Sequence, residues 1–70
     1  MKVIYDVATD VLRIVFREAI VEDFSEDRPN VVVDYDADDQ IVAMEIRKAS
    51  KIIENPRSLE HIILNEVLQT

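Results

Sequence analysis

The sequence has no glycine, no cysteine and no tryptophan, and it contains a single histidine. Without cysteine there is no disulfide and no thiolate metal site, and one histidine excludes a site with several histidine ligands. The lack of glycine excludes the phosphate-binding loops of P-loop and dinucleotide-binding enzymes, because these loops need glycine where the backbone approaches phosphate. The sequence therefore excludes the commonest nucleotide-binding motifs.

The chain is also short, with 70 residues, and we expect residues 1–70 to form a single domain. One small core leaves a narrow margin of stability, and a domain of this size usually needs a disulfide, a metal or a partner. Since disulfides and metal sites built from thiolates or several histidines are excluded, we predict a homodimer. No apolar run is long enough to span a bilayer, and the N-terminus lacks the pattern of a signal peptide. We therefore expect a cytoplasmic protein that does not bind membranes.

Basic residues are scarce: 8 Lys and Arg stand against 15 Asp and Glu, which gives a net charge of −7. Residues 22–39 hold a large share of the acids and only one base, Arg28. These acids are Glu22, Asp23, Glu26, Asp27, Asp34, Asp36, Asp38 and Asp39. Such a surface repels phosphate and attracts basic partners, so nucleic acid is not an expected ligand. We predict that Glu22, Asp23, Glu26 and Asp27 contact a basic protein.

Apolar residues alternate with polar ones over two stretches, which is typical of half-buried strands. The alternating residues are Val3, Tyr5, Leu12, Ile14 and Phe16, and then Val31, Val33, Tyr35, Val42, Met44 and Ile46. Turn residues at 6–10 and 36–40 interrupt the two stretches at matching places. We predict two similar hairpins in one antiparallel sheet over about residues 2–48, because short loops join antiparallel neighbours. Residues 20–24 are expected to form a short acidic edge strand, and Pro29 to start the next strand.

A helical period follows near the C-terminus and predicts a helix over about residues 56–69. Asn55 is a suitable N-cap and Pro56 suits the first helical position. The apolar residues are Leu59, Ile62, Ile63, Leu64, Val67 and Leu68. On a helical wheel they cover about 240°, which is more than one sheet can bury. We therefore place the dimer interface at Ile62, Leu64 and Leu68. The fold class is α+β, with four or five strands in a meander and this helix on the apolar sheet face, which holds Leu12, Ile14, Phe16, Val33, Tyr35, Met44 and Ile46.

Four acids near the second turn have the spacing of a calcium-binding loop: Asp34, Asp36, Asp38 and Glu45. The loop needs glycine at its sixth position, where this chain has Asp39, and its flanks here alternate as strands. One interpretation is a polar turn closed by aspartate side chains. The alternative is a calcium module or a hydrolase that uses a divalent cation at these four acids. We favour the turn, and we expect no cofactor.

His61 is the one side chain able to exchange protons near neutral pH. Ser58 lies three positions before it, but nothing in the sequence supplies the third group and oxyanion site that a nucleophilic pair needs. Tyr5 and Tyr35 occupy matching places in the two hairpins and are interpreted as packing residues at the edge of the core. No catalytic residue is predicted.

Residues in both hairpins resemble the YuzE-like family of small, uncharacterised bacterial and archaeal proteins. The residues that carry the resemblance are Tyr5-Asp6, Asp10, Leu12, Ile14, Val33-Asp34-Tyr35-Asp36, Asp38, Ile41-Val42, Glu45-Ile46 and Ala49-Ser50-Lys51. The match covers about residues 2–52 and departs from the family where glycine is common, at Asp39 and near Ala43. The resemblance implies no activity, cofactor or catalytic residue, and it suggests a partner protein of the kind found in toxin and antitoxin pairs. Together with the charge, it predicts a non-catalytic, homodimeric interaction module, antitoxin-like in docking a basic partner.

Overall fold

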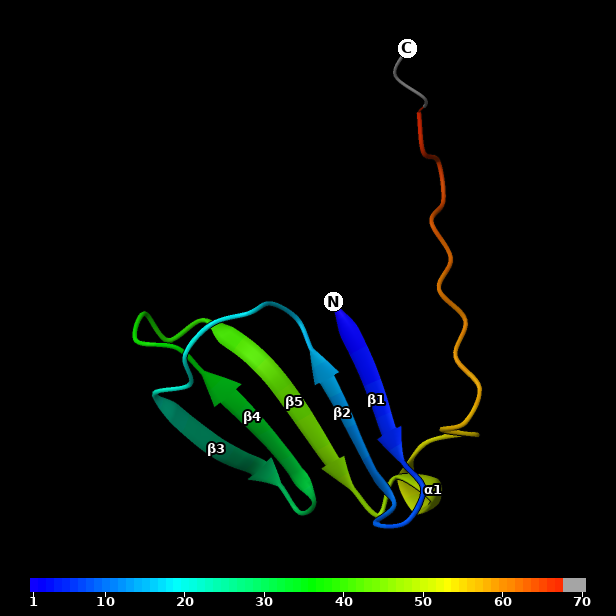
Figure 1. Ribbon diagram of the computed structural model, residues 1–70, viewed down its shortest axis with the longest axis horizontal. Coiled ribbons are helices and arrows are strands. Elements are labelled where there is room, and N and C mark those ends of the chain that lie inside the picture. Colours follow the sequence, from blue (N-terminus) through cyan, green and yellow to red (C-terminus); the bar gives the residue numbers. More distant parts are fainter. Residues whose placement is uncertain (68–70) are drawn as a thin grey trace.

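The computed structural model describes residues 1–67, which form five strands followed by one short helix (Figure 1). The elements are β1 (Lys2–Asp6), β2 (Val11–Val15), β3 (Asp23–Arg28), β4 (Val31–Tyr35), β5 (Ile41–Arg47) and α1 (Ala49–Ile52). The strands form one sheet in the order β1-β2-β5-β4-β3, and every neighbouring pair is antiparallel. The predicted α+β class, with an antiparallel sheet and one helix, is confirmed.

Both predicted hairpins are present, and a central seam joins them. β1 pairs with β2, β4 pairs with β5, and β2 pairs with β5 along the seam. After β2 the chain crosses to the far edge of the sheet, where β3 forms the predicted edge strand, somewhat later in the sequence than 20–24. Pro29 does not start β4. It forms a two-residue turn with Asn30, whose φ of 69° suits the position after proline in a type II turn.

The two faces of the sheet differ in character because side chains alternate along each strand. The register places Leu12, Ile46 and Val31 in one row and Ile14, Met44 and Val33 in the next, so this face is apolar. The opposite face carries charged residues on the same strands. The buried apolar residues are Leu12, Val32, Val33, Val42, Ala43 and Ala49. The core is therefore small, as the chain length predicts.

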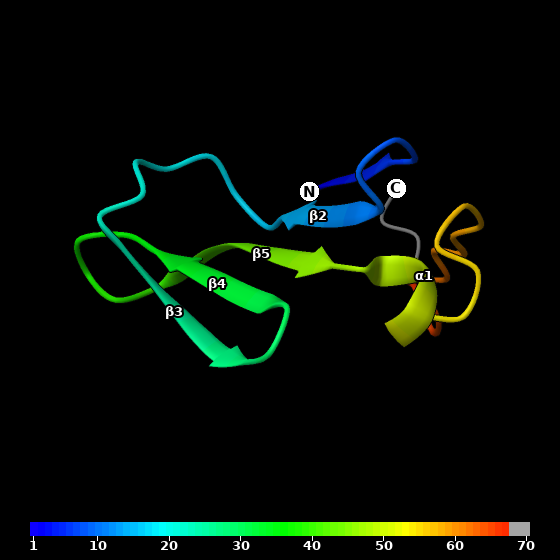
Figure 2. The same ribbon diagram turned by 90° about the horizontal axis from the view of Figure 1, so that it is seen from below.

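The predicted helix over 56–69 is wrong for the described residues. Within residues 1–67 the helix is α1, and residues 55–67 contain no helix. They pass beside β1, where Leu59, Glu60 and His61 line a hollow with Met1 and Val3, and their far end leads away from the sheet (Figures 1 and 2). The predicted interface residues Ile62 and Leu64 are 66% and 77% exposed, and Leu68 lies outside the described residues. A helix of this length is only marginally stable in water unless its apolar face packs against another surface. Most side chains of residues 55–67 are exposed, so the helical spacing alone does not produce a helix here.

Six of the described residues take the left-handed backbone conformation that glycine adopts most easily. They are Asp10, Asn30, Asp39, Lys48, Asn55 and Asn65. Aspartate and asparagine tolerate positive φ better than other residues, and five of the six are of these types. Lys48, the residue before α1, has a φ of 53° and no such advantage. The chain therefore makes its tight turns without glycine, at a cost that is greatest at Lys48.

Candidate functional site

The structure does not bring the four acids with calcium-loop spacing into one cluster, and arginines pair with three of them. The Asp34 carboxylate accepts a hydrogen bond from Arg13 at 3.1 Å, and Asp36 accepts one from Arg17. Arg47 donates to Glu45 at 3.1 Å, while Asp38 is exposed. Within residues 1–67 no group of three or more histidine, cysteine or acidic side chains is arranged to hold a metal ion. A cation at this turn would have to displace arginines from the oxygens it needs.

The Arg13–Asp34 pair crosses the sheet. Arg13 lies on β2 and Asp34 on β4, with β5 between them, so the ion pair spans a whole strand. Ala43, the residue of β5 opposite Asp34, is fully buried. Its small side chain leaves room for an arginine to pass over the strand. This explains why a small residue lies at position 43.

Aspartate side chains close both hairpin turns in the same way. The Asp6 carboxylate accepts the backbone N–H of Ala8 at 3.0 Å, and Asp36 accepts the N–H of Asp38 at 2.9 Å. Asp36 also accepts the N–H of Gln40 at 3.0 Å. These backbone hydrogen bonds, with Arg17, lower the pKa of Asp36 below its ordinary value. Of the two interpretations of this turn, the geometry favours turn closure for Asp36.

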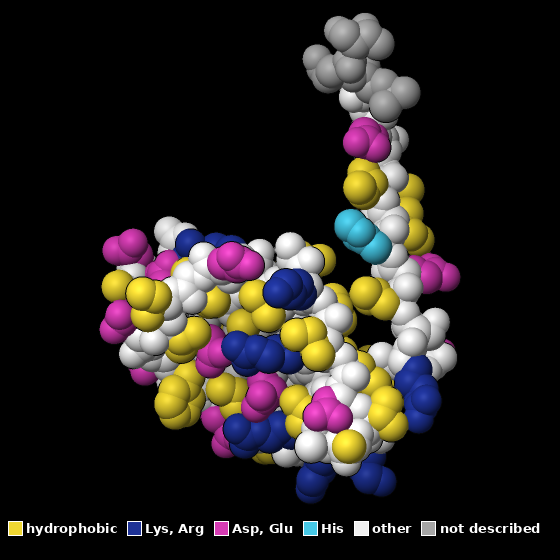
Figure 3. Space-filling model, viewed as in Figure 1, with side chains coloured by type: hydrophobic (Ala, Val, Ile, Leu, Met, Phe, Trp, Pro, Cys, Tyr) yellow, Lys and Arg dark blue, Asp and Glu magenta, His cyan; other side chains and the backbone are white. Residues whose placement is uncertain are grey.

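The predicted interaction residues lie together on and beside edge strand β3. Glu22, Asp23, Glu26 and Asp27, which we call the acidic edge, are all exposed. Acidic side chains gather on the side of the molecule where β3 lies (Figure 3). Within the described chain the acidic edge has one ion pair, from Glu26 to Arg47 at 3.9 Å. Asp34, Asp36 and Glu45 are thus paired with arginines, whereas the acidic edge is nearly free of ion pairs within the described chain.

An aromatic side chain accompanies the acidic edge. Phe24, on β3, is 67% exposed. The preceding segment adds Ile20 and Val21, which are also exposed. An exposed aromatic ring beside unpaired charges is typical of a protein-binding surface, because aromatic residues supply much of the binding energy and charges set the selectivity.

A second cluster of polar side chains centres on Asp10, and the spacing of residues in the sequence does not reveal it. Its carboxylate accepts hydrogen bonds from the Tyr5 hydroxyl at 2.6 Å, from the Ser50 hydroxyl at 2.6 Å and from the Ser50 backbone N–H at 2.9 Å. Its carbonyl oxygen accepts the N–H of Ala49 at 2.9 Å. We call Tyr5, Asp10 and Ser50 the Asp10 clamp, because they fasten α1 to the turn between β1 and β2.

The clamp also shifts two pKa values. Hydrogen bonds from Ser50 and Tyr5 lower the pKa of Asp10, and the hydrogen bond to Asp10 raises the pKa of Tyr5. Position 10 is at positive φ, where aspartate is tolerated. Tyr5, Asp10 and Ser50 are all among the residues that carry the family resemblance. That resemblance was therefore the one signal in the sequence that could have found this cluster.

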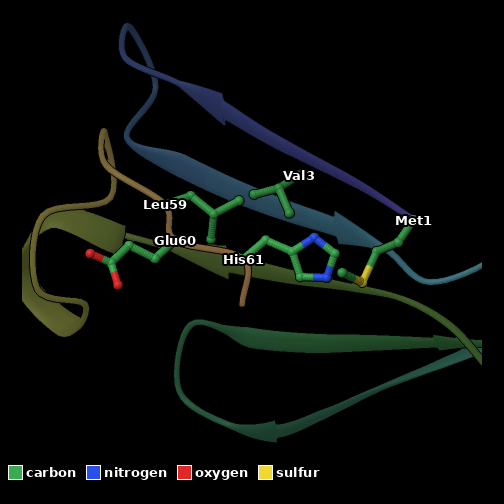
Figure 4. Close-up of a pocket in the computed structure, with 5 residues that line it drawn as sticks. All are labelled: Met1, Val3, Leu59, Glu60 and His61. Atoms are coloured by element: carbon green, nitrogen blue, oxygen red, sulfur yellow. The ribbon is translucent and has the colours of Figure 1, made fainter. Parts of the chain in front are cut away.

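His61 lies at the rim of an open hollow of about 380 Å³ lined by Met1, Val3, Leu59, Glu60 and His61. Leu59 points toward Val3, the imidazole lies beside Met1, and Glu60 points away (Figure 4). Ser58 and His61 are both exposed, and no hydrogen bond joins them in the described part of the chain. The hollow is a shallow apolar surface beside β1, without an arrangement for acid and base catalysis.

Comparison with known proteins identifies one match. A family model described as a protein of unknown function, DUF2283, matches residues 2–50. No curated protein and no solved structure matches the chain. Among the described residues no helix has the length and apolar character needed to cross a membrane. The matched range includes all five strands and reaches Ser50, so it takes in the whole Asp10 clamp.

Proposed function

The chain belongs to the DUF2283 family, whose function is unknown, and from this premise we propose that it is a non-catalytic module that docks a basic protein through its acidic edge. The observation that carries the proposal is the contrast between two groups of acids. Asp34, Asp36 and Glu45 are each paired with an arginine, whereas Glu22, Asp23 and Asp27 are exposed and have no ion pair within residues 1–67. Charge left unpaired on a protein surface is available to a partner.

The position of the acidic edge supports docking. β3 is an outer strand of the sheet, and only β4 pairs with it. Phe24 provides an apolar contact in the middle of the charged residues, and it is largely exposed. A partner with lysine or arginine around an apolar pocket would fit this surface. Electrostatic attraction would speed the encounter and select the partner more than it would increase the final affinity.

The finer identity of the partner is part of the same proposal. The resemblance to YuzE-like proteins suggests the role of an antitoxin, which neutralises a basic toxin such as a nuclease by covering its cationic surface. In that role the acidic edge imitates the phosphates that the toxin binds. We propose that the protein acts as a homodimer in the cytoplasm, so that each dimer presents two acidic edges.

A capture experiment with charge-matched variants tests the docking surface. The test variant carries Glu22→Gln, Asp23→Asn, Glu26→Gln and Asp27→Asn. The control variant carries Asp38→Asn, Asp39→Asn, Glu54→Gln and Glu60→Gln, which removes the same number of charges from exposed positions elsewhere. Each immobilised protein is incubated with extract from the organism that encodes it, at low and at high salt, and the bound proteins are identified.

The expected result is a basic protein retained at low salt by the native chain and by the control variant, and lost from the test variant. Its affinity, measured afterwards with the purified pair, should fall as ionic strength rises, because exposed charges are screened by salt. Retention by all three proteins, or binding that is independent of salt, would contradict the proposal. Failure to capture any basic protein at low salt would count against it as well.

A further inference from the structure

The two edges of the sheet differ in how they are protected from pairing with another strand. β3 carries most of the acidic edge, has a bulge between Glu26 and Arg28, and is followed at once by Pro29, and all three features discourage pairing. β1 has none of these features. Its register with β2 is regular from Lys2 to Asp6, and it contains no proline. An unprotected edge strand offers backbone groups to another chain.

The outward-facing backbone groups of β1 follow from the hydrogen bonding of β2. The N–H of Phe16, just after β2, donates to the carbonyl of Val42 at 2.8 Å, so even-numbered residues of β2 bond to β5. Odd-numbered residues such as Arg13 therefore bond to β1, where Arg13 lies opposite Ile4. By alternation, Val3 and Tyr5 direct their N–H and C=O groups away from the sheet.

We propose that β1 pairs with β1 of a second copy of this chain, antiparallel and with the two-fold axis at Ile4. In this register Ile4 lies opposite Ile4 of the partner subunit. Val3 exchanges two backbone hydrogen bonds with Tyr5 of the partner subunit, and the symmetric pair repeats them. The two five-stranded sheets then form one continuous sheet.

Charge and polarity both favour this register. Lys2 lies opposite Asp6 of the partner subunit on the same face, and opposite charges at such positions stabilise strand pairing. Lys2 has no ion pair within the described chain, and the Asp6 carboxylate has its second oxygen free of protein hydrogen bonds there. Ile4, 48% exposed in the single chain, becomes covered by its symmetry mate. Val3 and Tyr5 extend the apolar face across the axis.

The segment after α1 borders this edge on one side, because Leu59, Glu60 and His61 line a hollow together with Met1 and Val3. When the sheet is viewed from below, residues 57–67 lie lower in the picture than β1 (Figure 2). They therefore do not continue the sheet beyond β1. The interface uses only the five residues of β1 from each copy, so it belongs to the small, weak class of contacts. We therefore expect a dimer that depends on concentration. This interface supplies the contact for the proposed homodimer, and because it is separate from the acidic edge, its failure would leave the docking proposal standing.

Single cysteines test the register, because the native chain has none. Ile4→Cys places two thiols at a non-hydrogen-bonded pair, where the Cα atoms lie about 4.5 Å apart and a disulfide can form. Lys2→Cys lies on the same strand and face as Ile4→Cys. In this register the two copies of position 2 are four residues apart along the strands, and since each residue advances about 3.3 Å, their thiols lie about 13 Å apart. Phe24→Cys, exposed on β3, reports random collisions.

The three variants are oxidised in a glutathione buffer at high micromolar concentration, and covalent dimers are followed by non-reducing electrophoresis. Ile4→Cys should form the dimer about tenfold faster than either control, because only there do the sulfurs meet bonding geometry. A rate equal to that of Lys2→Cys or Phe24→Cys would overturn the proposal.

Sedimentation of the cysteine-free protein provides the second measurement. Ile4→Glu brings two carboxylates together at the axis but faces Arg13 within its own chain, so folding should be retained and dimerisation lost. A native chain that remains monomeric at millimolar concentration would refute the interface. A dimer that persists in Ile4→Glu would also refute it, and would direct attention to the apolar face of the sheet.

Discussion

Lys48 should become a site of stabilisation when it is replaced by glycine. Its backbone has φ 53° and ψ 43°, and its side chain makes no capping hydrogen bond with α1. A residue with a Cβ atom pays about 1–2 kcal/mol in this conformation. Glycine removes that strain but gives the unfolded chain more freedom, which costs about 0.4–1 kcal/mol. We expect Lys48→Gly to gain about 0.5–1 kcal/mol, the difference between these two effects.

For a domain of this length, a gain of about 1 kcal/mol raises Tm by about 4–8 °C, so Lys48→Gly should raise it by about 2–8 °C. Circular dichroism during heating and urea unfolding measures the change. Lys48→Ala is the matched control, because it removes the same charge while keeping the Cβ atom, and it should not gain stability. Lys51→Gly, inside α1, should lose about 0.5–1 kcal/mol. The reasoning is refuted if Lys48→Gly is no more stable than Lys48→Ala.

Four further outcomes follow from the described contacts. Leu12→Ala, at a position 7% exposed, should cost about 2–4 kcal/mol in urea unfolding, whereas Ile41→Ala, at 47%, should cost less than about 1 kcal/mol, and equal losses would contradict the assigned core. Because the folded pKa values of Asp10 and Asp36 lie below 3.8, their contribution to stability should be present above about pH 4 and lost as pH falls through the lowered values. Asp10→Asn should therefore show a smaller loss of stability than the native chain between pH 5 and pH 2 in urea titrations, and an unchanged slope would count against the clamp. Ser50→Ala should accelerate hydrogen exchange at the start of α1 while leaving the central strands protected, and uniform acceleration would show that the clamp is not local. Millimolar Mg²⁺ or Ca²⁺ should leave Tm unchanged, because arginines occupy the carboxylates of Asp34, Asp36 and Glu45, and a clear rise would reveal a bound ion.

The strands and their faces could be predicted because the information is local. Alternation of apolar residues shows which side chains share a face, and matching turns show that Tyr5 and Tyr35 belong to equivalent hairpins. The pairing of β2 with β5 could not be predicted in this way. It joins residues far apart in the chain, such as Val11 and Arg47, and no local pattern specifies it.

The helix predicted for the C-terminal segment is wrong within the described residues for the same physical reason, because its stability is not a local property. Asn55, Pro56 and the spacing of Leu59 and Ile63 are sound local signals for a helix. A helix of that length depends on packing for most of its stability, and the spacing of residues does not reveal whether a surface is available. The Asp10 clamp likewise joins residues 10 and 50, which only the fold brings together.

The seam between β2 and β5 has a consequence for how the chain folds. Each half of the sheet, β1–β2 and β3–β4–β5, is built from neighbours in sequence and can close its short turns quickly. The seam requires a much larger loop to close before any of its contacts form, and that entropy is lost without immediate compensation. Formation of the seam should therefore limit the rate of folding, with the two halves assembling on either side of the barrier. Mutations along β2 and β5 would then slow folding itself, whereas mutations confined to the outer strands would mainly accelerate unfolding.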